Sequence, residues 1–585
     1  MNLPRNCHTP NGVDATTNGV HHTGNPTTQD NAAVDDFAVD PNPAWTPRKK
    51  LRVITIGAGF SGLTFAYKLQ HQNPEMQDLV SHTIFEARED IGGTWLANVY
   101  PGVQCDVPAH IYAFPFDPNP DWTHFFATGK EIHEYMQKIT KKWNLDQDVK
   151  LSHRVIETVW QAESGQWKVT VESEGRQWDE YAEVLVSGQG VLNSWQWPEI
   201  EGLHDFKGHK SHSANWDANY DYSHKRIALI GNGSTGVQVL PQLARLPETE
   251  ILSFQRSPNW VYNPVTPGAL VGKDDPRANP EFTEEEKLYF RKNPDEHRAY
   301  RKLIISKINK GFYLYVKDSP TNIRATKEAI DQISEKLKYD PMLCKALIPD
   351  WPLGCRRITP ANGYLESFLQ PNVQLITSPI VRITEHSILT ADGSDYPVDV
   401  VACTTGYAVS WCPQWQMIGR NNVDLIKEWT VDPQSYLSLA APDMPNYFMF
   451  LGPNAVVAHG SLVEAINWTG DYVIQWLRKI ATEDIKSIVP KTQVVKDFIR
   501  YGVELHKKFV WTGGCRSWFK RDTVDGRVIA AFPGSALLFK NLASQLRPED
   551  FEIEYRSKNR WHFLGNGFTS YELDPNNDLA WYVEK

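Results

Sequence analysis

The sequence predicts an α/β fold with two Rossmann-like domains and a helical insertion. Three observations support this fold class. "LRVITIGAGFSGLTFAYKLQ" (51–70) has the pattern of an apolar strand, a tight glycine turn and an apolar-periodic helix. "KRIALIGNGSTGVQVLPQLA" (225–244) repeats the same pattern, which predicts a second unit of the same kind. Residues 271–349 are highly charged with helical spacing of apolar residues, as expected for a helical insertion.

The first glycine turn has the spacing G-x-G-x-x-G, formed by Gly57, Gly59 and Gly62. The first glycine permits the turn, the second lets the backbone approach a pyrophosphate, and the third lets the helix pack on the strand. Glu86 follows the next strand, where a carboxylate can accept hydrogen bonds from ribose hydroxyls. This order of elements predicts a dinucleotide site. The alternative is an α/β unit whose glycines serve packing only.

The second turn repeats this spacing with Gly231, Gly233 and Gly236. The strand that follows ends in Arg256 and Ser257 rather than in an acid. These side chains suit the charge and the oxygen atoms of a 2′-phosphate, which favours NADP over NAD. A solvated surface arginine is the alternative interpretation of Arg256.

Two dinucleotide units in one chain are typical of a flavoprotein that uses NADPH, so we expect FAD in the first site and NADPH in the second. The net charge of −10 offers no basic footprint for nucleic acid. No apolar run approaches the ~20 residues of a transmembrane helix, and the first residues lack a secretory signal. We therefore expect a soluble intracellular, cytoplasmic protein. The seven scattered cysteines lack C-x-x-C spacing, so neither a disulfide framework nor a metal site is expected.

Two longer patterns flank the glycine turns. "FKGHKSHSANWD" (206–217) matches F-x-G-x-x-x-H-x-x-x-W-[P/D], and "GGTWLANVYPGVQCD" (92–106) matches [A/G]-G-x-W-x-x-x-x-[F/Y]-P-[G/M]-x-x-x-D. From about residue 50 to 560 the chain therefore resembles the type I Baeyer-Villiger monooxygenases, which are FAD- and NADPH-dependent class B flavoproteins. The wording "PLGCRR-TP" resembles the fungal subgroup of secondary metabolism.

The resemblance implies an enzyme that uses NADPH and O₂ to insert one oxygen atom next to a ketone carbonyl through a C4a-peroxyflavin, giving an ester or lactone. A bulky secondary-metabolite ketone is the implied substrate. Arg357, in "PDWPLGCRRITPANGYLESFLQPNV" (349–373), is implied as the catalytic residue that stabilises the peroxide anion. Arginine suits this role because it stays charged at any working pH. Asp106 is implied to pair with Arg357 and orient it.

The same resemblance adds further site residues to those read from the turns. The predicted cofactor-binding residues are Gly57, Gly59, Gly62, Glu86, Thr94, Trp95, Gln104, Asp106, Tyr112, Val155, Gly231, Gly233, Ser234, Thr235, Gly236, Arg256, Ser257 and Arg356. His212, Trp216 and Trp518 are expected to couple domain movement to catalysis, with Trp518 in a mobile control loop. The alternative for His212 and Trp216 is that they only pin a linker against the second sheet.

The predicted domains follow the chain in six segments. They are a disordered N-terminal extension (1–48), the first part of an FAD-binding domain (49–195), the first part of an NADP-binding domain (196–270), the helical insertion (271–349), the second part of the NADP-binding domain (350–394), and the second part of the FAD-binding domain with the control loop (395–585). The insertion is interpreted as either a solvated cap or a substrate lid.

Two other function classes stay open on the sequence alone. One is a flavin N- or S-monooxygenase with the same double-Rossmann plan. The other is a non-oxygenating flavin reductase or an interaction protein. The expected partners are O₂ and a small-molecule ketone, with no nucleic acid, and the sequence predicts no oligomeric state.

Overall fold

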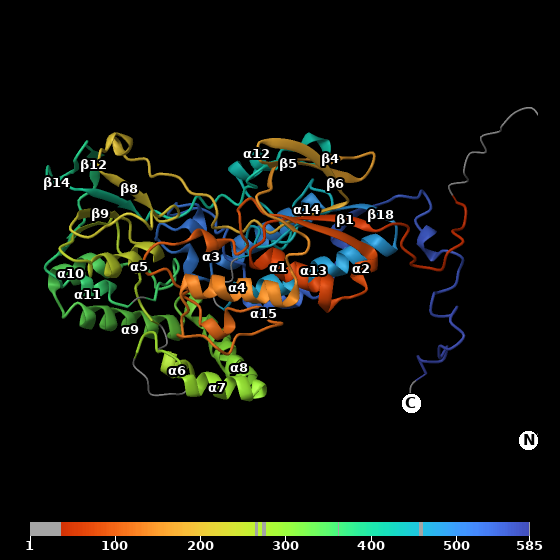
Figure 1. Ribbon diagram of the computed structural model, residues 1–585, viewed down its shortest axis with the longest axis horizontal. Helices are drawn as coiled ribbons and strands as arrows, with labels where there is room; N and C mark the ends of the chain where they lie inside the picture. Colours follow the sequence, from red (N-terminus) through yellow and green to blue (C-terminus); the bar gives the residue numbers. More distant parts are fainter. Residues whose placement is uncertain (1–36, 264–266, 272–276, 361, 456–459, 584–585) are drawn as a thin grey trace, which may run out of the picture.

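Two five-stranded parallel sheets form the framework of the protein (Figure 1). The computed structural model describes residues 37–263, 267–271, 277–360, 362–455 and 460–583. The first sheet has the strand order β17 (Tyr447–Met449), β7 (Val184–Ser187), β1 (Leu51–Ile56), β2 (Val80–Phe85) and β3 (Val149–Lys150). The second has the order β11 (Val373–Ile376), β10 (Glu250–Phe254), β9 (Arg226–Ile230), β15 (Val400–Cys403) and β8 (His209–His212). The predicted α/β fold with two Rossmann-like units is confirmed.

The first sheet is buried on both faces, as parallel sheets usually are. Val53 of β1 belongs to one apolar cluster, whereas its neighbours Ile54 and Ile56 belong to another. The first cluster contains α1 (Phe60–Tyr67), which follows the first glycine turn, and the long helix α13 (Leu462–Thr482) packed against it. The near-continuous apolar sequence of β1 follows from this double burial.

The other face of the first sheet is covered by a four-stranded sheet. Its order is β16 (Gln416–Ile418), β4 (Arg154–Gln161), β5 (Gln166–Ser173) and β6 (Arg176–Ala182). Trp160 and Trp167 face each other across β4 and β5 and pack in the same cluster as Ile54. A separate pair, β18 (Ile485–Pro490) and β19 (Phe551–Tyr555), follows α13.

The second sheet is also covered on both faces. Helix α5 (Ser234–Leu243) follows the second glycine turn and packs over Ile227 and Leu229. Ala228 and Ile230 point to the opposite face, where Ile383 and Ile388 cover them. These two residues belong to a small sheet of β12 (Ile380–Ile383), β13 (Ser387–Thr390) and β14 (Asp395–Pro397).

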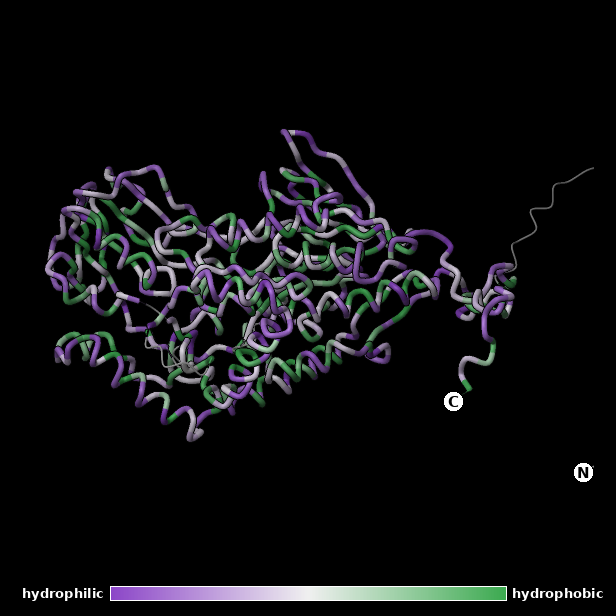
Figure 2. The backbone as a smooth tube through the Cα atoms, turned by 60° about the horizontal axis from the view of Figure 1, so that its bottom comes forward, coloured by the Kyte–Doolittle hydropathy of each residue, from purple (hydrophilic) through white to green (hydrophobic). Residues whose placement is uncertain are grey.

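The helical insertion connects the two units along the lower edge in Figure 1. Its long helix α8 (Pro294–Lys310) buries Ile304 in the first cluster, whereas α9 (Pro320–Lys336) buries Ala329 and Ile333 against the second unit. Hydrophilic and hydrophobic residues alternate along such helices in Figure 2, as expected where one face packs and the other is exposed. The insertion also contains the α-helices α7 (Glu284–Lys292) and α10 (Pro341–Leu347).

The end of the second unit differs from the predicted boundary at residue 394. Strand β15 pairs with β9 and β8 in the second sheet, so this unit extends to Cys403. In the sequence, β15 runs directly into the linker that follows it, so the sequence does not show which unit contains the strand. Only its pairing with β9 and β8 does. The return to the first unit therefore begins at Thr404.

Part of the predicted N-terminal extension has a defined place. Residues 1–36 lie outside the described residues, but residues 37–48 lie beside the C-terminal segment. Ala44 donates its backbone N–H to the Phe568 carbonyl at 2.7 Å, and Trp45 contacts the Phe563 ring. This placement differs from the expected disorder of residues 37–48. Their own sequence is too polar to predict ordered structure. The contacts that hold them come from the C-terminal segment, more than 500 residues away in the chain.

One disulfide bond corrects the expectation from the cysteine pattern. Cys355 and Cys515 are bonded although 160 residues separate them in the chain. Spacing rules recognise closely spaced cysteines, so they give no signal for such a distant pair. Within the described part of the chain, no helix is long and apolar enough to cross a membrane.

Candidate active site

The first glycine turn is built so that two of its three glycines are required by the protein itself. Gly57 has φ +105°, and a Cβ there would lie 2.7 Å from the Gly188 carbonyl oxygen. A Cβ at Gly62 would lie 2.1 Å from the Gly57 carbonyl oxygen. Because both obstacles are backbone atoms, no side chain fits at these positions.

Gly59 differs from its two neighbours. A Cβ at Gly59 would meet Gly93 Cα at 3.6 Å, which is an ordinary contact. The protein therefore tolerates a side chain here, and packing does not explain the glycine. Gly59 is the N-cap of α1, where free backbone N–H groups and the helix dipole attract an anion. This position fits the close approach of a dinucleotide pyrophosphate.

Glu86 lies at the end of β2 and supports the first turn. Its carboxylate accepts hydrogen bonds from the backbone N–H groups of Ala58 at 2.8 Å and Arg88 at 2.9 Å. The side chain is buried, so these bonds fix its position beside the glycine turn. The predicted contact with a ribose hydroxyl stays a prediction, which the remaining lone pairs of the carboxylate permit.

The other residues predicted for cofactor contact occupy different environments. Thr94 and Trp95 begin α3 (Thr94–Ala97), and the indole of Trp95 donates to the Tyr112 hydroxyl at 3.2 Å. Burial raises the pKa of Tyr112. Val155 on β4 is buried in the cluster that contains Ile56 and Phe85, and the Gln104 carbonyl accepts from Gln238. Their contacts with a cofactor stay predictions.

The second glycine turn repeats the division seen in the first. Gly231 has φ +108°, and its Cβ would lie 2.7 Å from the Thr404 carbonyl oxygen. A Cβ at Gly236 would lie 2.3 Å from the Gly231 carbonyl oxygen. By contrast, a Cβ at Gly233 would meet no heavy atom within 4 Å. The middle glycine of each turn thus faces space that a bound pyrophosphate would fit.

Two helix residues follow the second turn. Ser234 begins α5, and its hydroxyl lies 3.2 Å from that of Thr359. The Thr235 side chain interacts with the hydroxyl of Tyr100, which comes from the first unit. The start of α5 is therefore held by segments on both sides of it.

Two arginines gather beside the second turn. Arg256 is exposed just after β10, and its positive charge contributes, after burial, to lowering the pKa of Arg356. Arg356 donates to Asn259 Oδ1 at 3.0 Å and to the Pro258 carbonyl. Asn232 donates to the Ser257 carbonyl at 2.8 Å, which fixes the loop after β10. Two neighbouring cations repel each other unless an anion lies between them, so this arrangement fits a phosphate.

Arg357 and Asp106 form a bidentate ion pair, as the resemblance implies. Arg357 Nε donates to Asp106 Oδ2, and Nη2 donates to Oδ1, both at 2.6 Å. The Asp106 carboxylate raises the pKa of Arg357, so the guanidinium is charged at every working pH. The Arg357 side chain is 35% exposed and that of Asp106 20% exposed. The guanidinium is therefore fixed in orientation and still accessible.

The loop that carries Asp106 packs on α5 of the second unit. The Tyr100 hydroxyl donates to Gln238 Oε1 at 3.0 Å, and Gln238 Nε2 donates to the Gln104 carbonyl at 3.0 Å. Gly102 has φ +81°, and its Cβ would lie 2.6 Å from the Gln238 carbonyl oxygen. Gln238 had no sequence signal, because it lies on a helix whose only recognised feature was the preceding turn.

Tyr315 is a second residue that sequence reasoning missed. It ends the short helix η4 (Gly311–Tyr315) of the insertion, and its pKa, raised mainly by burial, is also affected by the charges of Arg357 and Asp106. Its ring lies 5.9 Å from that of Trp511. The insertion thus brings an aromatic side chain next to Gly354, three residues before Arg357, where a Cβ would lie 3.1 Å from the Tyr315 ring. The aromatic run 312–315 was the only signal, and it does not distinguish a site from a core.

His212 ends β8 and contacts both linkers between the units, namely the outward linker between β7 and β8 and the return linker that begins at Thr404. Its ring stacks on Trp195 of the outward linker at 4.6 Å. Nδ1 accepts from the Ala214 N–H at 3.1 Å, so the neutral ring donates through Nε2 to Thr405 Oγ1 of the return linker at 3.2 Å. Burial lowers the pKa of His212 to about 4. These contacts suit both domain coupling and simple pinning, so its role stays a prediction.

The pKa of His212 gives a pH dependence with a definite sign. Because the folded pKa of about 4 lies below the ordinary value of 6.5, neutral His212 contributes stability that is fully present above pH 6.5. This stability is lost as the pH falls to about 4, because the protonated ring cannot accept from Ala214. The loss is at most about 3 kcal/mol. We expect His212→Gln to make the free energy of unfolding correspondingly less sensitive to acid.

Urea titrations of both proteins from pH 7 to 4 measure this effect. His386→Gln is a suitable control, because this histidine is exposed just before β13 of the same unit. Identical acid dependence in wild type and His212→Gln would contradict the assignment.

The two predicted coupling tryptophans lie in different places. Trp216 stacks on Tyr222 at 4.9 Å in the apolar cluster of the second unit. Trp518 begins the short helix η7 (Trp518–Lys520) and lies 6.2 Å from the ring of Trp411, just after the return linker. Trp518 is therefore beside the linker region, whereas Trp216 is beside the second sheet. Coupling by either residue stays a prediction.

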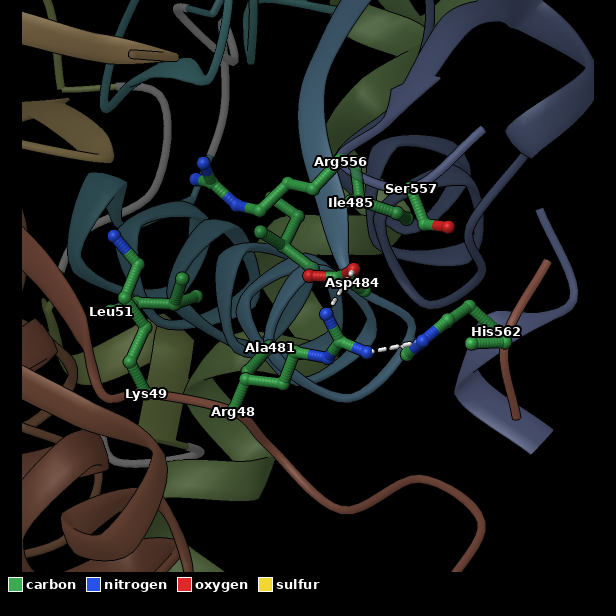
Figure 3. Close-up of a pocket in the computed structure, with 11 residues that line it drawn as sticks. Arg48, Lys49, Leu51, Ala481, Asp484, Ile485, Arg556, Ser557 and His562 are labelled. Atoms are coloured by element: carbon green, nitrogen blue, oxygen red, sulfur yellow. Dashed lines mark hydrogen bonds and ion pairs between the residues drawn. The ribbon is translucent and has the colours of Figure 1, made fainter. Parts of the chain in front are cut away.

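A cavity of about 520 Å³ is lined by residues from three segments, 38–51, 480–485 and 556–562 (Figure 3). Arg48 lies at its centre and contacts Asp484 and His562. None of the predicted site residues lines this cavity. Among the described residues, no group of three or more His, Cys, Asp or Glu side chains could hold a metal ion.

Comparisons with known proteins agree with this geometry. The family model for flavin-binding monooxygenase-like proteins matches residues 49–269. An FAD-binding monooxygenase of Aspergillus terreus is 41% identical over 545 residues, which cover 92% of this chain and 96% of the relative. A Baeyer-Villiger monooxygenase of Pseudomonas aeruginosa is 30% identical over 520 residues, which cover 88% of this chain and 94% of that protein.

A solved structure shares the fold. Cyclohexanone monooxygenase from Rhodococcus sp. Phi1, bound to NADP⁺, superposes with a TM-score of 0.74 at 24% identity, covering 87% of this chain and 100% of that chain. This likeness concerns the architecture of the two Rossmann-like units.

The glycine turns, the paired arginines and the relatives define a flavoprotein monooxygenase that depends on NADPH, with FAD and NADPH as its cofactors. The chain belongs to the flavin-binding monooxygenases, in the group of the Baeyer-Villiger monooxygenases. The class predicted from the sequence is confirmed.

Proposed function

We propose that the protein inserts one oxygen atom of O₂ next to the carbonyl carbon of a ketone and so produces an ester or a lactone. The observation that carries this proposal is the bidentate pair of Arg357 and Asp106. Asp106 comes from a loop of the first unit that packs on α5, and Arg357 comes from the segment before β11 of the second unit, so the pair places a permanent cation between the units. Oxygen transfer to a carbonyl carbon needs such a cation, because negative charge develops on oxygen during the reaction.

When bound, FAD would activate O₂ in its reduced form, and NADPH would supply the hydride that reduces FAD. Arg357 holds a positive charge where an oxygen anion needs stabilisation. Asp106 fixes the plane of the guanidinium, because Nε and Nη2 both donate to it. The opposite edge of the guanidinium, with Nη1, points away from Asp106 and can donate to oxygen. We assign these roles to the catalytic pair.

The surroundings of the pair strengthen its charge effects. The ring of Tyr315 lies next to Gly354, three residues before Arg357, and packs near the fully buried Trp511, which contacts Phe509. Aromatic side chains exclude water, and an electrostatic interaction is stronger in a medium of low dielectric constant. The insertion contributes Tyr315, which supports a role of the insertion as one wall of the substrate site.

We further propose that the substrate is a bulky ketone of fungal secondary metabolism. The sequence resemblance of "PLGCRR-TP" (352–360) supports this class, as does the high identity to a fungal relative. Residues 49–195 with the segment after Cys403 would hold FAD, and residues 196–270 with 350–403 would hold NADPH. The pairing of β15 supports the last boundary.

The function is tested by incubating the purified FAD-loaded protein with NADPH, O₂ and a panel of cyclic, aromatic and polycyclic ketones and organic sulfides. We expect at least one ketone to give an ester or lactone. Sulfoxide without ester from the entire panel would instead indicate an S-monooxygenase. NADPH consumption that yields only hydrogen peroxide with every compound would indicate a reductase or oxidase.

Arg256 is proposed to bind the 2′-phosphate of NADPH. We expect Arg256→Ala to raise the KM for NADPH and to leave that for NADH unchanged, because NADH lacks this phosphate. A charged hydrogen bond contributes about 1.5–3 kcal/mol, so the KM for NADPH should rise roughly ten- to a hundredfold. Steady-state rates with both nucleotides measure the effect.

Arg382→Ala provides the matched control, since Arg382 is exposed on β12 of the same unit. It should leave both KM values unchanged. Equal losses for NADPH and NADH in Arg256→Ala would refute the phosphate assignment.

A further inference from the structure

The disulfide bond lies directly beside the catalytic arginine in the sequence. Cys355 precedes Arg356 and Arg357, and its sulfur is bonded to Cys515, with the two Cα atoms 6.3 Å apart. Cys355 is 0% and Cys515 1% exposed. The bond therefore joins the arginine segment to a second loop in a place that solvent does not reach.

That second loop, residues 513–527, is organised as one body. Lys520 is buried and donates to the carbonyls of Gly513 at 2.7 Å and Val524 at 2.6 Å. Thr523 Oγ1 donates to the Lys520 carbonyl and accepts from the Gly526 N–H. Since Gly513 and Val524 are tied to the same ammonium group, a bond at Cys515 restrains most of loop 513–527.

Loop 513–527 also packs tightly on the arginine segment around the bond. A Cβ at Gly513 would lie 3.3 Å from Cys355 Sγ and 3.4 Å from Pro352 Cδ. Trp518, which lies beside Trp411 after the return linker, belongs to the same loop. The loop thus contacts the arginine segment at Gly513 and lies beside the linker region at Trp518.

Three consecutive residues of the arginine segment have three different anchors. Cys355 is bonded to loop 513–527, Arg356 is hydrogen-bonded to Pro258 and Asn259 of the second unit, and Arg357 is paired with Asp106. Only the first of these anchors is covalent. This covalent connection limits how far the loop can move away from Arg357.

We propose that Cys355 and Cys515 are positioning residues, whose bond keeps loop 513–527 in register with the Arg357 guanidinium. Neither sulfur takes part in the reaction. The bond fixes the backbone from which Arg357 reaches Asp106, and it transmits the position of the loop to the arginine. The readout of this inference rests on the proposed oxygenation, because an enzyme with an incorrectly placed Arg357 should release hydrogen peroxide instead of forming an ester.

Reduction opens the cross-link in a balanced step. Two electrons and two protons convert the S–S bond into two thiols, and a water-soluble phosphine that supplies the electrons becomes its oxide with oxygen from water. The reduced loop then keeps only its non-covalent contacts with the arginine segment.

The bond itself is tested by peptide mapping without reductant. Trypsin cuts after Lys345 and Arg356 and after Lys508 and Arg516, so each cysteine lies in its own peptide, 346–356 and 509–516. We expect these two peptides to be found linked, and to separate after treatment of the unfolded protein with the phosphine. Two free peptides from the purified, thiol-blocked enzyme would overturn the inference.

The positioning role is tested with the double variant Cys355→Ala/Cys515→Ala. We expect the rate of ester formation to fall on the order of tenfold, because small errors in placement slow a reaction strongly. The hydrogen peroxide formed per NADPH should rise several-fold, and the visible spectrum of bound FAD should stay the same. Cys344→Ala, which removes a free and half-buried thiol, should leave both readouts at wild-type values.

The outcomes separate the inference from the proposed function. A folded, FAD-loaded double variant with wild-type peroxide yield would overturn the positioning role. If the double variant does not fold, Cys355→Ser/Cys515→Ser, which keeps most of the side-chain volume and cannot form the bond, gives the same comparison. If wild type forms no ester from any ketone, the proposed function fails. The positioning role is then tested by the rate of NADPH oxidation, which should differ between the cross-linked protein and the protein without the bond.

Discussion

Replacing Arg357 by alanine should abolish ester formation and leave FAD bound. The side chain supplies the fixed positive charge beside the reacting oxygen, and removal of one such group lowers kcat by about 10²–10³-fold. The flavin site is formed by the turn around Gly59 in the first unit, so its affinity should not depend on Arg357. Product analysis by gas chromatography, together with the visible spectrum of the purified variant, measures both effects.

Two further variants make this prediction specific. Arg357→Lys keeps a positive charge but cannot donate two parallel hydrogen bonds to Asp106, so its rate should lie between those of wild type and Arg357→Ala. Arg298→Ala removes an arginine that is 64% exposed on α8, and its rate should equal that of wild type. Ester formation by Arg357→Ala at close to the wild-type rate would refute the catalytic role.

The second large effect is expected for Gly59→Ala. Its Cβ meets the protein only at an ordinary 3.6 Å contact, so the apoprotein should fold with nearly unchanged stability. The methyl group should instead occupy space needed by the pyrophosphate of FAD. Inserting a methyl group into a tight contact costs about 1–3 kcal/mol, so the Kd for FAD should rise roughly ten- to a hundredfold. Titration of the apoprotein with FAD measures it.

Gly62→Ala is the contrasting variant in the same turn. Its Cβ would lie 2.1 Å from a backbone oxygen, so this substitution should destabilise the protein before any cofactor binds. The comparison thus separates a glycine that serves the cofactor from one that serves the fold. Unchanged FAD affinity in a folded Gly59→Ala protein would show that the turn is not the pyrophosphate site.

Much of the framework follows from local rules that act on neighbouring residues. The apolar strands β1 and β9, their glycine turns and their helices are specified within about twenty residues each, because a tight parallel turn admits no side chain at Gly57 or Gly231. Sequence reasoning therefore predicted both Rossmann-like units. The pair of Arg357 and Asp106 joins residues 251 positions apart, and only the family resemblance indicated it.

The features that were missed depend on contacts between distant segments. Tyr315 of the insertion lies beside Gly354, and the bond of Cys355 with Cys515 spans 160 residues. The assignment of β15 required its pairing with β9, and the place of residues 37–48 required the C-terminal segment. Periodicity and spacing describe neighbours along the chain, so they give no information about these approaches.

A crystal structure of the enzyme with FAD and NADP⁺ bound tests the central claim most directly. The measured quantity is the distance from the Arg357 guanidinium to the edge of the flavin ring where oxygen reacts. We expect Arg357 to be still paired with Asp106 and to lie close enough to that edge for a single oxygen species to fit between them. The guanidinium should then be within hydrogen-bonding distance, about 3 Å, of that oxygen species. A guanidinium directed away from the flavin, or separated from it by intact protein, would contradict the assignment of Arg357 and the mechanism built on it.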